Sequence, residues 1–220
     1  MSIKAILFDA YGTLLDIHSA IARHESRLGG HVAAISALWR QKQLEYTWTG
    51  TLARRYRPFD QLTAAALDYA LGQFRIEDKD LRRDLLGAYR HLSPFADVGA
   101  ALDQLSRRGL RLGVLSNGTS DMLNAAFAKH ELDDLLNPLL SVDSLRIYKP
   151  DPQVYAMAAK HLDLPPAQIG FVSSNAWDAM GAASFGFRVF WLRRQNGPIE
   201  YDLATQATII SSLGELSGQL

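Results

Sequence analysis

Short apolar runs alternate with helical patterns along most of this 220-residue chain, and this alternation limits the fold more than any other feature. The runs are Ile3–Phe8, Leu110–Leu115, Leu139–Val142, Ile169–Val172 and Arg188–Leu192. Apolar strands that are separated by helices indicate a parallel sheet with both faces covered. We therefore predict an α/β fold built on a Rossmann-like parallel sheet.

Residues 16–92 depart from this alternation because they carry only helical patterns. Residues 38–45 mix apolar and polar side chains at helical spacing, and residues 62–74 are rich in Ala and Leu. Asp78 and Asp80 come before a further helical pattern, where the helix dipole favours acids. We predict that residues 1–15 and 93–220 form the core domain and that residues 16–92 form a helical domain inserted after the first strand.

Composition excludes several classes of protein. Lys plus Arg and Asp plus Glu number 23 each, so no excess charge favours nucleic acid or an anionic membrane. The chain has no cysteine, which excludes disulfides and thiolate metal sites and fits a reducing compartment. The N-terminal run Ile3–Phe8 is too short for a signal peptide, and no stretch reaches the roughly 20 apolar residues that span a bilayer. We expect a cytoplasmic protein.

Polar residues follow the predicted strands at the points where they end. Asp9 follows the first strand, and Ser116-Asn117-Gly118 ends the second. Tyr148-Lys149-Pro150 lies in the loop after the third, and Ser173-Ser174-Asn175 ends the fourth, with Asp178 one helical turn further on. The carboxyl ends of parallel strands lie along one edge of the sheet. Two carboxylates, a lysine, hydroxyls and amides are therefore expected in one cleft.

Each of these residues has a simpler explanation when it is taken alone. Asp9 can close a turn or cap a helix, and Asp178 is favourable in the first turn of any helix. Lys149 can lie in a solvated turn, Arg40 can extend into solvent, and Trp177 can belong to the core. Their joint occurrence at four strand ends favours a functional site.

This arrangement resembles the haloacid dehalogenase superfamily over nearly the whole chain. The four motifs of that superfamily correspond, in order, to Asp9…Thr13, to Ser116, to Lys149-Pro150 and to the acidic loop with Asp178. The helical insertion corresponds to the cap domain that many members place after the first strand. The closer resemblance is to the L-2-haloacid dehalogenases, through Phe-Asp-Ala-Tyr-Gly-Thr, Ser-Asn-Gly and Ser-Ser-Asn-Ala-Trp-Asp.

The resemblance implies hydrolysis of short L-2-haloalkanoic acids to D-2-hydroxy acids through a covalent ester on Asp9. It implies catalytic roles for Asp9, Thr13, Lys149, Ser173, Asn175 and Asp178. It implies substrate binding by Tyr11, Arg40, Leu44, Phe59, Ser116, Asn117, Tyr155 and Trp177, with Arg40 and Asn117 at the departing halide. It also implies a reaction without metal or cofactor, a small haloacid as the partner, and a homodimer, with which the apolar helices of the insertion are compatible.

Two departures from the phosphatase members of the superfamily favour a halide. Those members place an acid two residues after the nucleophile to protonate the leaving alkoxide, and Tyr11 stands there in this chain. They usually place a magnesium-binding Asp where this chain has Ser173-Ser174. A magnesium-dependent phosphatase is the alternative. A silent binding protein is a third hypothesis, against which the costly burial of two acids and a lysine counts.

Overall fold

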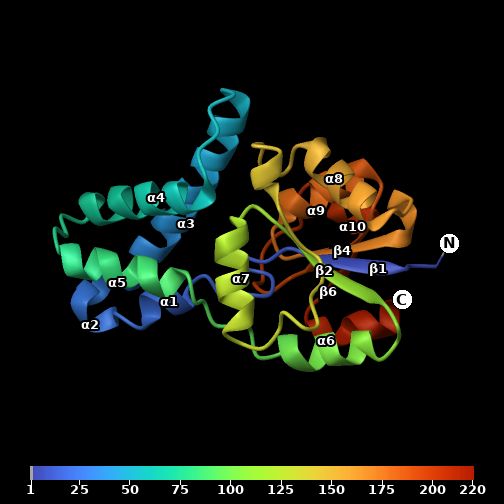
Figure 1. The fold of residues 1–220 in the computed structure, drawn as a ribbon. Coiled ribbons are helices and arrows are strands. Elements are labelled where there is room, and N and C mark those ends of the chain that lie inside the picture. Colours follow the sequence, from blue (N-terminus) through green and yellow to red (C-terminus); the bar gives the residue numbers. More distant parts are fainter. Residues whose placement is uncertain (1) are drawn as a thin grey trace.

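The computed structural model describes residues 2–220 and shows a six-stranded sheet at the centre of the fold (Figure 1). Every strand pair is parallel, and the strand order is β3-β2-β1-β4-β5-β6. The strands are β1 (Ala5–Phe8), β2 (Arg111–Ser116), β3 (Leu139–Ser141), β4 (Ile169–Ser173), β5 (Arg188–Leu192) and β6 (Ala207–Ile210). This parallel sheet confirms the predicted α/β fold.

The register brings the carboxyl ends of the central strands to one edge of the sheet. Phe8, the last residue of β1, pairs with Val114 of β2 and with Val172 of β4. All residues of β1 and β4 are buried, because helices cover both faces of the sheet and each of these strands pairs with a neighbour on both edges. Asp9 and Ser173 therefore lie next to each other at the same edge.

The sheet has one more strand than the sequence predicts. Strand β6 follows a one-turn helix, α10 (Leu203–Gln206), and pairs with β5 at the edge of the sheet. Thr208 and Ile209 of β6 are exposed, and only Ile210 is buried. A short, half-exposed edge strand lacks the continuous apolar run that identifies a buried strand, which explains why the pattern did not reveal it.

Four helices of eight residues or more belong to the described part of the core. They are α6 (Val98–Ser106), α7 (Ser120–Ala128), α8 (Pro152–Leu162) and α9 (Ala176–Phe185). Helices α8 and α9 lie on one side of the sheet, and α6 lies on the other with the C-terminal 3-10 helix Leu213–Gln219 (Figure 1). Thr119 caps α7, because its side-chain oxygen accepts the N–H of Met122 at 3.2 Å.

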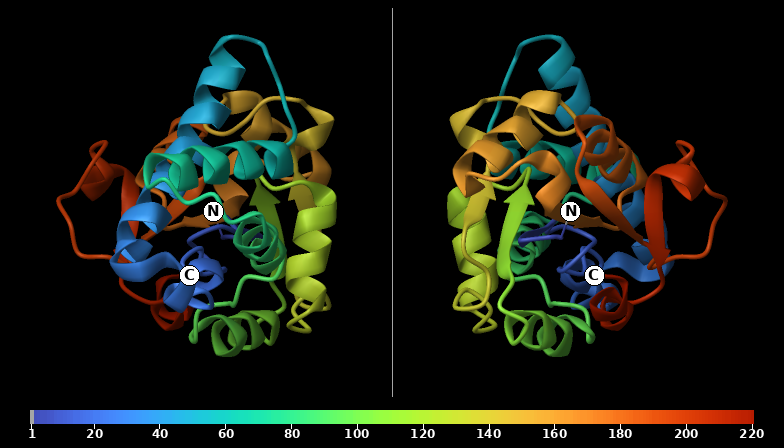
Figure 2. Two further views of the ribbon diagram at one scale, coloured as in Figure 1. Left: turned by 90° about the vertical axis from the view of Figure 1, so that its left-hand side faces the viewer. Right: turned by 90° about the vertical axis from the view of Figure 1, so that its right-hand side faces the viewer.

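Residues 16–92 are helical, as the sequence predicts. They form α1 (Ser19–Ala22), α2 (Glu25–Leu28), α3 (Val32–Leu52), α4 (Phe59–Gln73) and α5 (Lys79–Tyr89), with a 3-10 turn at Gly29–His31. These helices lie together beyond the carboxyl ends of the strands (Figures 1 and 2).

The chain leaves the core and returns to it at adjacent points. The N–H of Asp16 donates to the carbonyl of Ser93 at 2.8 Å, and the N–H of Phe95 donates to the carbonyl of Leu14 at 3.0 Å. This pairing lies at the two domain boundaries expected from the sequence. The division into two domains remains a prediction.

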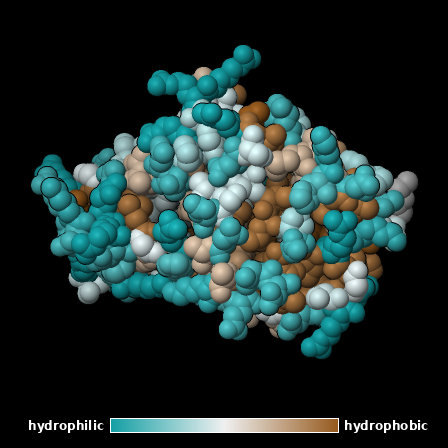
Figure 3. Space-filling model, viewed as in Figure 1, coloured by the Kyte–Doolittle hydropathy of each residue, from teal (hydrophilic) through white to brown (hydrophobic). Residues whose placement is uncertain are grey.

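On the face seen in Figure 3, the surface differs between the two halves of the molecule. The helical insertion is mostly hydrophilic, whereas apolar residues gather over the half that contains the sheet (Figure 3). Within residues 2–220, no helix combines the length and the apolar character that crossing a bilayer requires.

Candidate active site

Asp9 lies at the carboxyl end of β1 with donors on both carboxylate oxygens. Its Oδ2 accepts from Thr13 Oγ1 at 3.0 Å and from Asn175 Nδ2 at 2.8 Å, and its Oδ1 accepts from Lys149 Nζ at 3.1 Å. Asp9 is only 5% exposed. Residues that lie 140 and 166 positions along the chain from Asp9 therefore converge on it, as the parallel topology predicts.

Lys149 joins Asp9 to a second carboxylate. Its Nζ lies 3.1 Å from Asp9 Oδ1 and 2.9 Å from Asp178 Oδ2, and its side chain is fully buried. Burial alone would lower the pKa of Lys149, but the charges of Asp178 and Asp9 outweigh it, so the pKa is raised. Lys149 therefore stays charged between the two acids.

Asp178 is buried in the first turn of α9 and accepts hydrogen bonds on both oxygens. Oδ2 accepts from Ser173 Oγ at 3.0 Å as well as from Lys149, and Oδ1 accepts from the hydroxyl of Tyr155 at 2.8 Å. Burial raises the pKa of Asp178 to about 6, aided by the charge of Asp9 and opposed by Lys149. A carboxylate with this pKa accepts a proton near neutral pH more readily than an ordinary one does.

The turn after β1 places the side chain of Thr13 between Asp9 and the loop after β4. Gly12 has a φ of +88°, which favours glycine, and its carbonyl accepts from Ser174 Oγ at 2.6 Å. Thr13 Oγ1 accepts the N–H of Ser174 at 2.9 Å while it donates to Asp9. The carbonyl of Thr13 accepts from Arg194, from Nε at 2.9 Å and from Nη2 at 2.8 Å.

Neither Ser174 nor Arg194 was assigned a role in the site from the sequence. Ser174 belongs to the motif at 173–178, so the sequence already indicated that it lies in the cleft with Ser173 and Asn175. Arg194 follows β5 outside every motif, and only the folded structure places it against the turn that holds Thr13.

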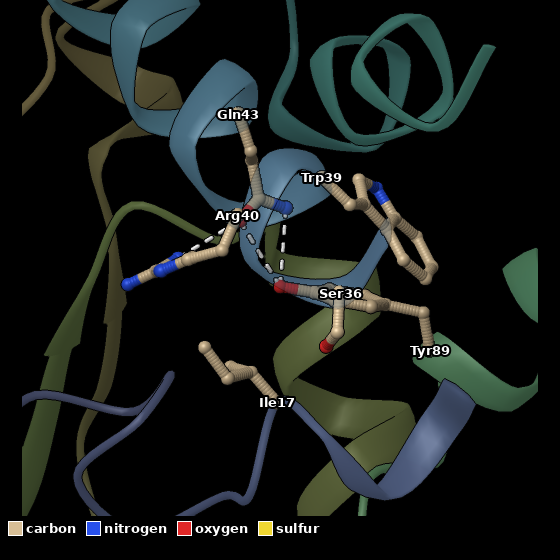
Figure 4. A pocket seen from close by; sticks show the side chains of 6 residues that line it. All are labelled: Ile17, Ser36, Trp39, Arg40, Gln43 and Tyr89. Atoms are coloured by element: carbon tan, nitrogen blue, oxygen red, sulfur yellow. Dashed lines mark hydrogen bonds between the residues drawn. The ribbon is translucent and has the colours of Figure 1, made fainter. Parts of the chain in front are cut away.

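Arg40 extends from α3 to the carboxyl edge of the sheet. Its Nη1 donates to Gln43 Oε1 at 2.8 Å, and its Nη2 lies 3.3 Å from both the carbonyl of Tyr11 and Asn175 Oδ1. Figure 4 shows the guanidinium beside Gln43 and directed away from Trp39. All three acceptors are neutral, so the positive charge of Arg40 is available to an anion.

Ser116 ends β2, Asn117 follows it, and both are buried. Ser116 Oγ accepts the N–H of Gly118 at 3.1 Å, and Asn117 Oδ1 accepts the N–H of Lys149 at 3.0 Å. Within residues 2–220, the Nδ2 of Asn117 has no acceptor. These contacts fix the loop after β2 and leave one amide donor for a ligand.

Tyr11 lies in an aromatic cluster beneath the helical insertion. Its ring is tilted against Phe59 at 5.4 Å between centroids and stacks on Tyr89 at 5.7 Å. A Cβ at Gly118 would come within 2.7 Å of the Tyr11 ring, so the loop after β2 needs glycine there. Burial raises the pKa of the Tyr11 phenol well above its ordinary value.

The remaining predicted binding residues have different surroundings. Leu44 lines an open cleft beside Arg40, and Trp177 meets Trp48 edge-on at 5.4 Å between centroids. Tyr155 is fully buried, and its hydroxyl contacts Asp178 rather than an open pocket. The hydrogen bond from Tyr155 therefore positions the carboxylate of Asp178.

A cleft of about 450 Å³ opens beside this cluster. The turn after β1, helix α3, the loop after β4 and the segment that follows β5 line it, and its wall includes Ser174 and Asn175. A much smaller gap beneath Arg40 is lined by Ile17, Ser36, Trp39, Gln43 and Tyr89 (Figure 4). Among residues 2–220, no cluster of three or more His, Asp or Glu side chains is placed to hold a metal ion.

Comparison with known proteins assigns the chain and its fold to one class of hydrolases. A model of the haloacid dehalogenase-like hydrolase family matches residues 3–186, and the chain belongs to that family. The resemblance found in the motifs is thereby confirmed.

Relatives within the family are dehalogenases. The (S)-2-haloacid dehalogenase 4A of Burkholderia cepacia is 46% identical over 216 residues, which cover 98% of this chain and 94% of that protein. A solved dehalogenase structure has a TM-score of 0.97 and 46% identity, over 100% of this chain and 97% of that one. The L-2-haloacid dehalogenase from Xanthobacter autotrophicus with chloropropionic acid covalently bound has a TM-score of 0.87 and 36% identity, over 97% and 96%.

Proposed function

We propose that this hydrolase converts short L-2-haloalkanoic acids into D-2-hydroxy acids through a covalent ester on Asp9, without a metal ion. The relatives support dehalogenation over phosphate transfer, because curated proteins 40–47% identical over nearly the whole chain are (S)-2-haloacid dehalogenases.

The observation that carries the proposal is the environment of Tyr11. A phosphatase needs an acid two residues after the nucleophile, because an alkoxide must be protonated as it leaves. Tyr11 is 3% exposed, stacks on Tyr89, and has a pKa raised well above its ordinary value by burial. Such a phenol is a poor proton donor at neutral pH. A halide leaves without a proton, so this site suits a carbon–halogen bond.

In the first step Asp9 attacks the halogen-bearing carbon. A carboxylate oxygen of Asp9 forms the new C–O bond as the C–halogen bond breaks, and the halide leaves with the bonding electron pair. Attack from the side opposite the halide inverts the carbon, which converts the L-haloacid into a D-configured ester. We assign the guanidinium of Arg40 and the Nδ2 of Asn117 as donors to the departing halide.

In the second step water hydrolyses the ester. Asp178 accepts a proton from water, and the hydroxide attacks the carbonyl carbon of Asp9. Thr13 Oγ1 and Asn175 Nδ2, which hydrogen-bond to Asp9 Oδ2, stabilise the oxyanion. The bond between that carbon and the ester oxygen then breaks. The hydroxy acid leaves with an oxygen from Asp9 and takes the proton from Asp178, which regenerates the Asp178 carboxylate. Asp9 is left as the carboxylic acid, and it returns to the carboxylate when it releases its proton to solvent.

Halide release from racemic 2-chloropropionate in the presence of EDTA tests the function. We expect halide and D-lactate from half of the racemate, with no L-lactate, because only the L-substrate is inverted. Hydrolysis of phosphate esters that depends on added magnesium, with no halide release, would favour the phosphatase alternative.

We further propose that residues 16–92 act as a cap over the site, and that the protein is a cytoplasmic homodimer. The placement of Arg40 on α3 beside Asn175 supports the first point. The absence of cysteine fits a reducing compartment. Light scattering after gel filtration measures the mass, which for a dimer is twice the 24.4 kDa of one chain.

A further inference from the structure

The cleft beside the active site connects solvent with the residues that hold Asp9. It measures about 450 Å³, and Asn175 in its wall donates to Asp9 Oδ2 at 2.8 Å. Asp9 itself is nearly inaccessible. Asn175 therefore connects the wall of this cleft directly with the nucleophile.

The cleft is lined by cations and by no acid among the described residues. Arg40, Arg193 and Arg194 face it together with His18, and no Asp or Glu belongs to its lining. Arg194 is compensated by an ion pair with Asp97 at 3.0 Å. No such ion pair compensates the charge of Arg40 or Arg193 among the described residues.

Arg193 follows β5 and lines the cleft without an ion-pair partner among the described residues. Its guanidinium donates to the carbonyl of Gly197 and lies 5.3 Å from the ring centroid of Trp191, which also lines the cleft. Within residues 2–220, neither Arg193 nor Arg40 forms a salt bridge. The neutral contacts hold Arg193 in place without cancelling its charge.

We propose that this cleft is the entrance for a small carboxylate anion, and that Arg193 attracts the substrate carboxylate before the substrate reaches the site beside Asp9. This inference rests on the proposed function, in which the substrate is a 2-haloacid anion. Clefts with low-dielectric walls and charges of one sign concentrate the opposite ion locally. Arg193 lies outside the groups that contact Asp9 or Asp178, so it acts on the capture of the anion and not on the chemical steps.

The test compares three proteins at low and high ionic strength. Wild type, Arg193→Gln and Lys160→Gln are assayed for halide release from L-2-chloropropionate at about 10 mM and about 300 mM salt. Lys160→Gln removes the same charge from an exposed site near the end of α8. That end lies at the opposite edge of the sheet, because Leu162 contacts Arg111 at the start of β2.

We expect Arg193→Gln to raise KM about threefold at low salt with kcat unchanged, and to differ little from wild type at high salt. Lys160→Gln should follow wild type, and Arg193→Lys should restore most of the lost kcat/KM. Equal salt dependence in wild type and Arg193→Gln would overturn the inference, as would a loss confined to kcat. A wild-type enzyme that releases no halide would instead overturn the proposed function, and this inference with it.

Discussion

At the scale of single residues, Asp178 has to serve two purposes. Its negative charge compensates the positive charge of Lys149, from which it is separated by 2.9 Å. In the proposed mechanism it also accepts a proton from the hydrolytic water. Without Asp178, attack by Asp9 remains feasible because that step transfers no proton. The second step then lacks its base, which contributes typically 10²–10⁴-fold.

Asp178→Asn should therefore trap the ester and lower kcat roughly 10³-fold. Mass spectrometry of the Asp9 peptide after one turnover measures the added acyl group. Asp121→Asn, which changes an exposed acid in the first turn of α7, is the control and should turn over normally. In heavy-oxygen water, wild type should incorporate label into Asp9 during a single turnover. An unlabelled Asp9 would contradict the covalent mechanism.

Tyr155 sets the pH range over which Asp178 works as a base. The pKa of Asp178 is raised to about 6 by burial, and the hydrogen bond from Tyr155 opposes that rise. Below this pKa Asp178 is protonated and cannot accept a proton, so activity falls as the pH drops through about 6. Removing the hydroxyl removes a donor to the ionised form, so the pKa rises further.

Tyr155→Phe should move the acid limb of the kcat profile upward by about 0.7 pH unit, which corresponds to a hydrogen bond of about 1 kcal/mol. The exposed Tyr69 of α4 provides the control, and Tyr69→Phe should leave the limb in place. A Tyr155→Phe enzyme with a higher KM and an unmoved limb would return Tyr155 to the substrate-binding role expected from the sequence.

At the scale of elements, Arg194 connects three segments of the core: the segment after β5, the turn after β1 and the residues before α6. It follows β5, donates twice to the carbonyl of Thr13, and pairs with Asp97 before α6. Asp97 also accepts the N–H of Leu213 at 2.9 Å, which attaches the C-terminal segment. Since Thr13 donates to Asp9, Arg194 is a positioning residue for the turn and does not contact Asp9.

Arg194→Lys keeps the charge and loses the two-pronged contact with Thr13. We expect kcat to fall roughly tenfold with little change in KM, because displacement of the Thr13 turn misplaces Asp9. The dependence on salt should remain that of wild type, in contrast to Arg193→Gln. Asp97→Asn should give a smaller loss in the same direction, and unchanged kcat in both variants would limit Arg194 to a role in stability.

At the scale of the whole molecule, the sequence predicted what the parallel topology alone determines. Asp9, Lys149 and Asp178 each lie near the carboxyl end of a strand or in a following turn, so a parallel sheet brings them together whatever the details of packing. Strand β6 was missed because it is short and half-exposed. The contact of Tyr155 with Asp178 depends on how α8 packs on α9, and no local pattern contains that information.

The helical insertion touches the core at several places besides the covalent connection, among them the contact of Arg40 with Asn175 and that of Trp48 with Trp177. In addition, the hydroxyl of Tyr56 donates to Asp143, and the N–H of Tyr148 donates to Thr51 Oγ1 at 3.1 Å. The rings of Tyr56 and Tyr148 stack at 5.2 Å between centroids. These contacts join the insertion to the sheet edge, so in the proposed role of the insertion as a cap we expect their strength to govern how often the site opens.

Tyr56→Phe should therefore weaken the closed state without altering the catalytic groups. Loss of a hydrogen bond to a charged acceptor, about 1.5 kcal/mol, raises the open population roughly tenfold. Hydrogen exchange should show faster exchange of the Tyr148 amide, while amides of buried β1 stay protected. Tyr46→Phe on α3 is the matched control. Unchanged exchange at Tyr148 would show that the other contacts with the core, such as the pairing of Asp16 with Ser93 and the contact of Arg40 with Asn175, suffice to hold the insertion closed.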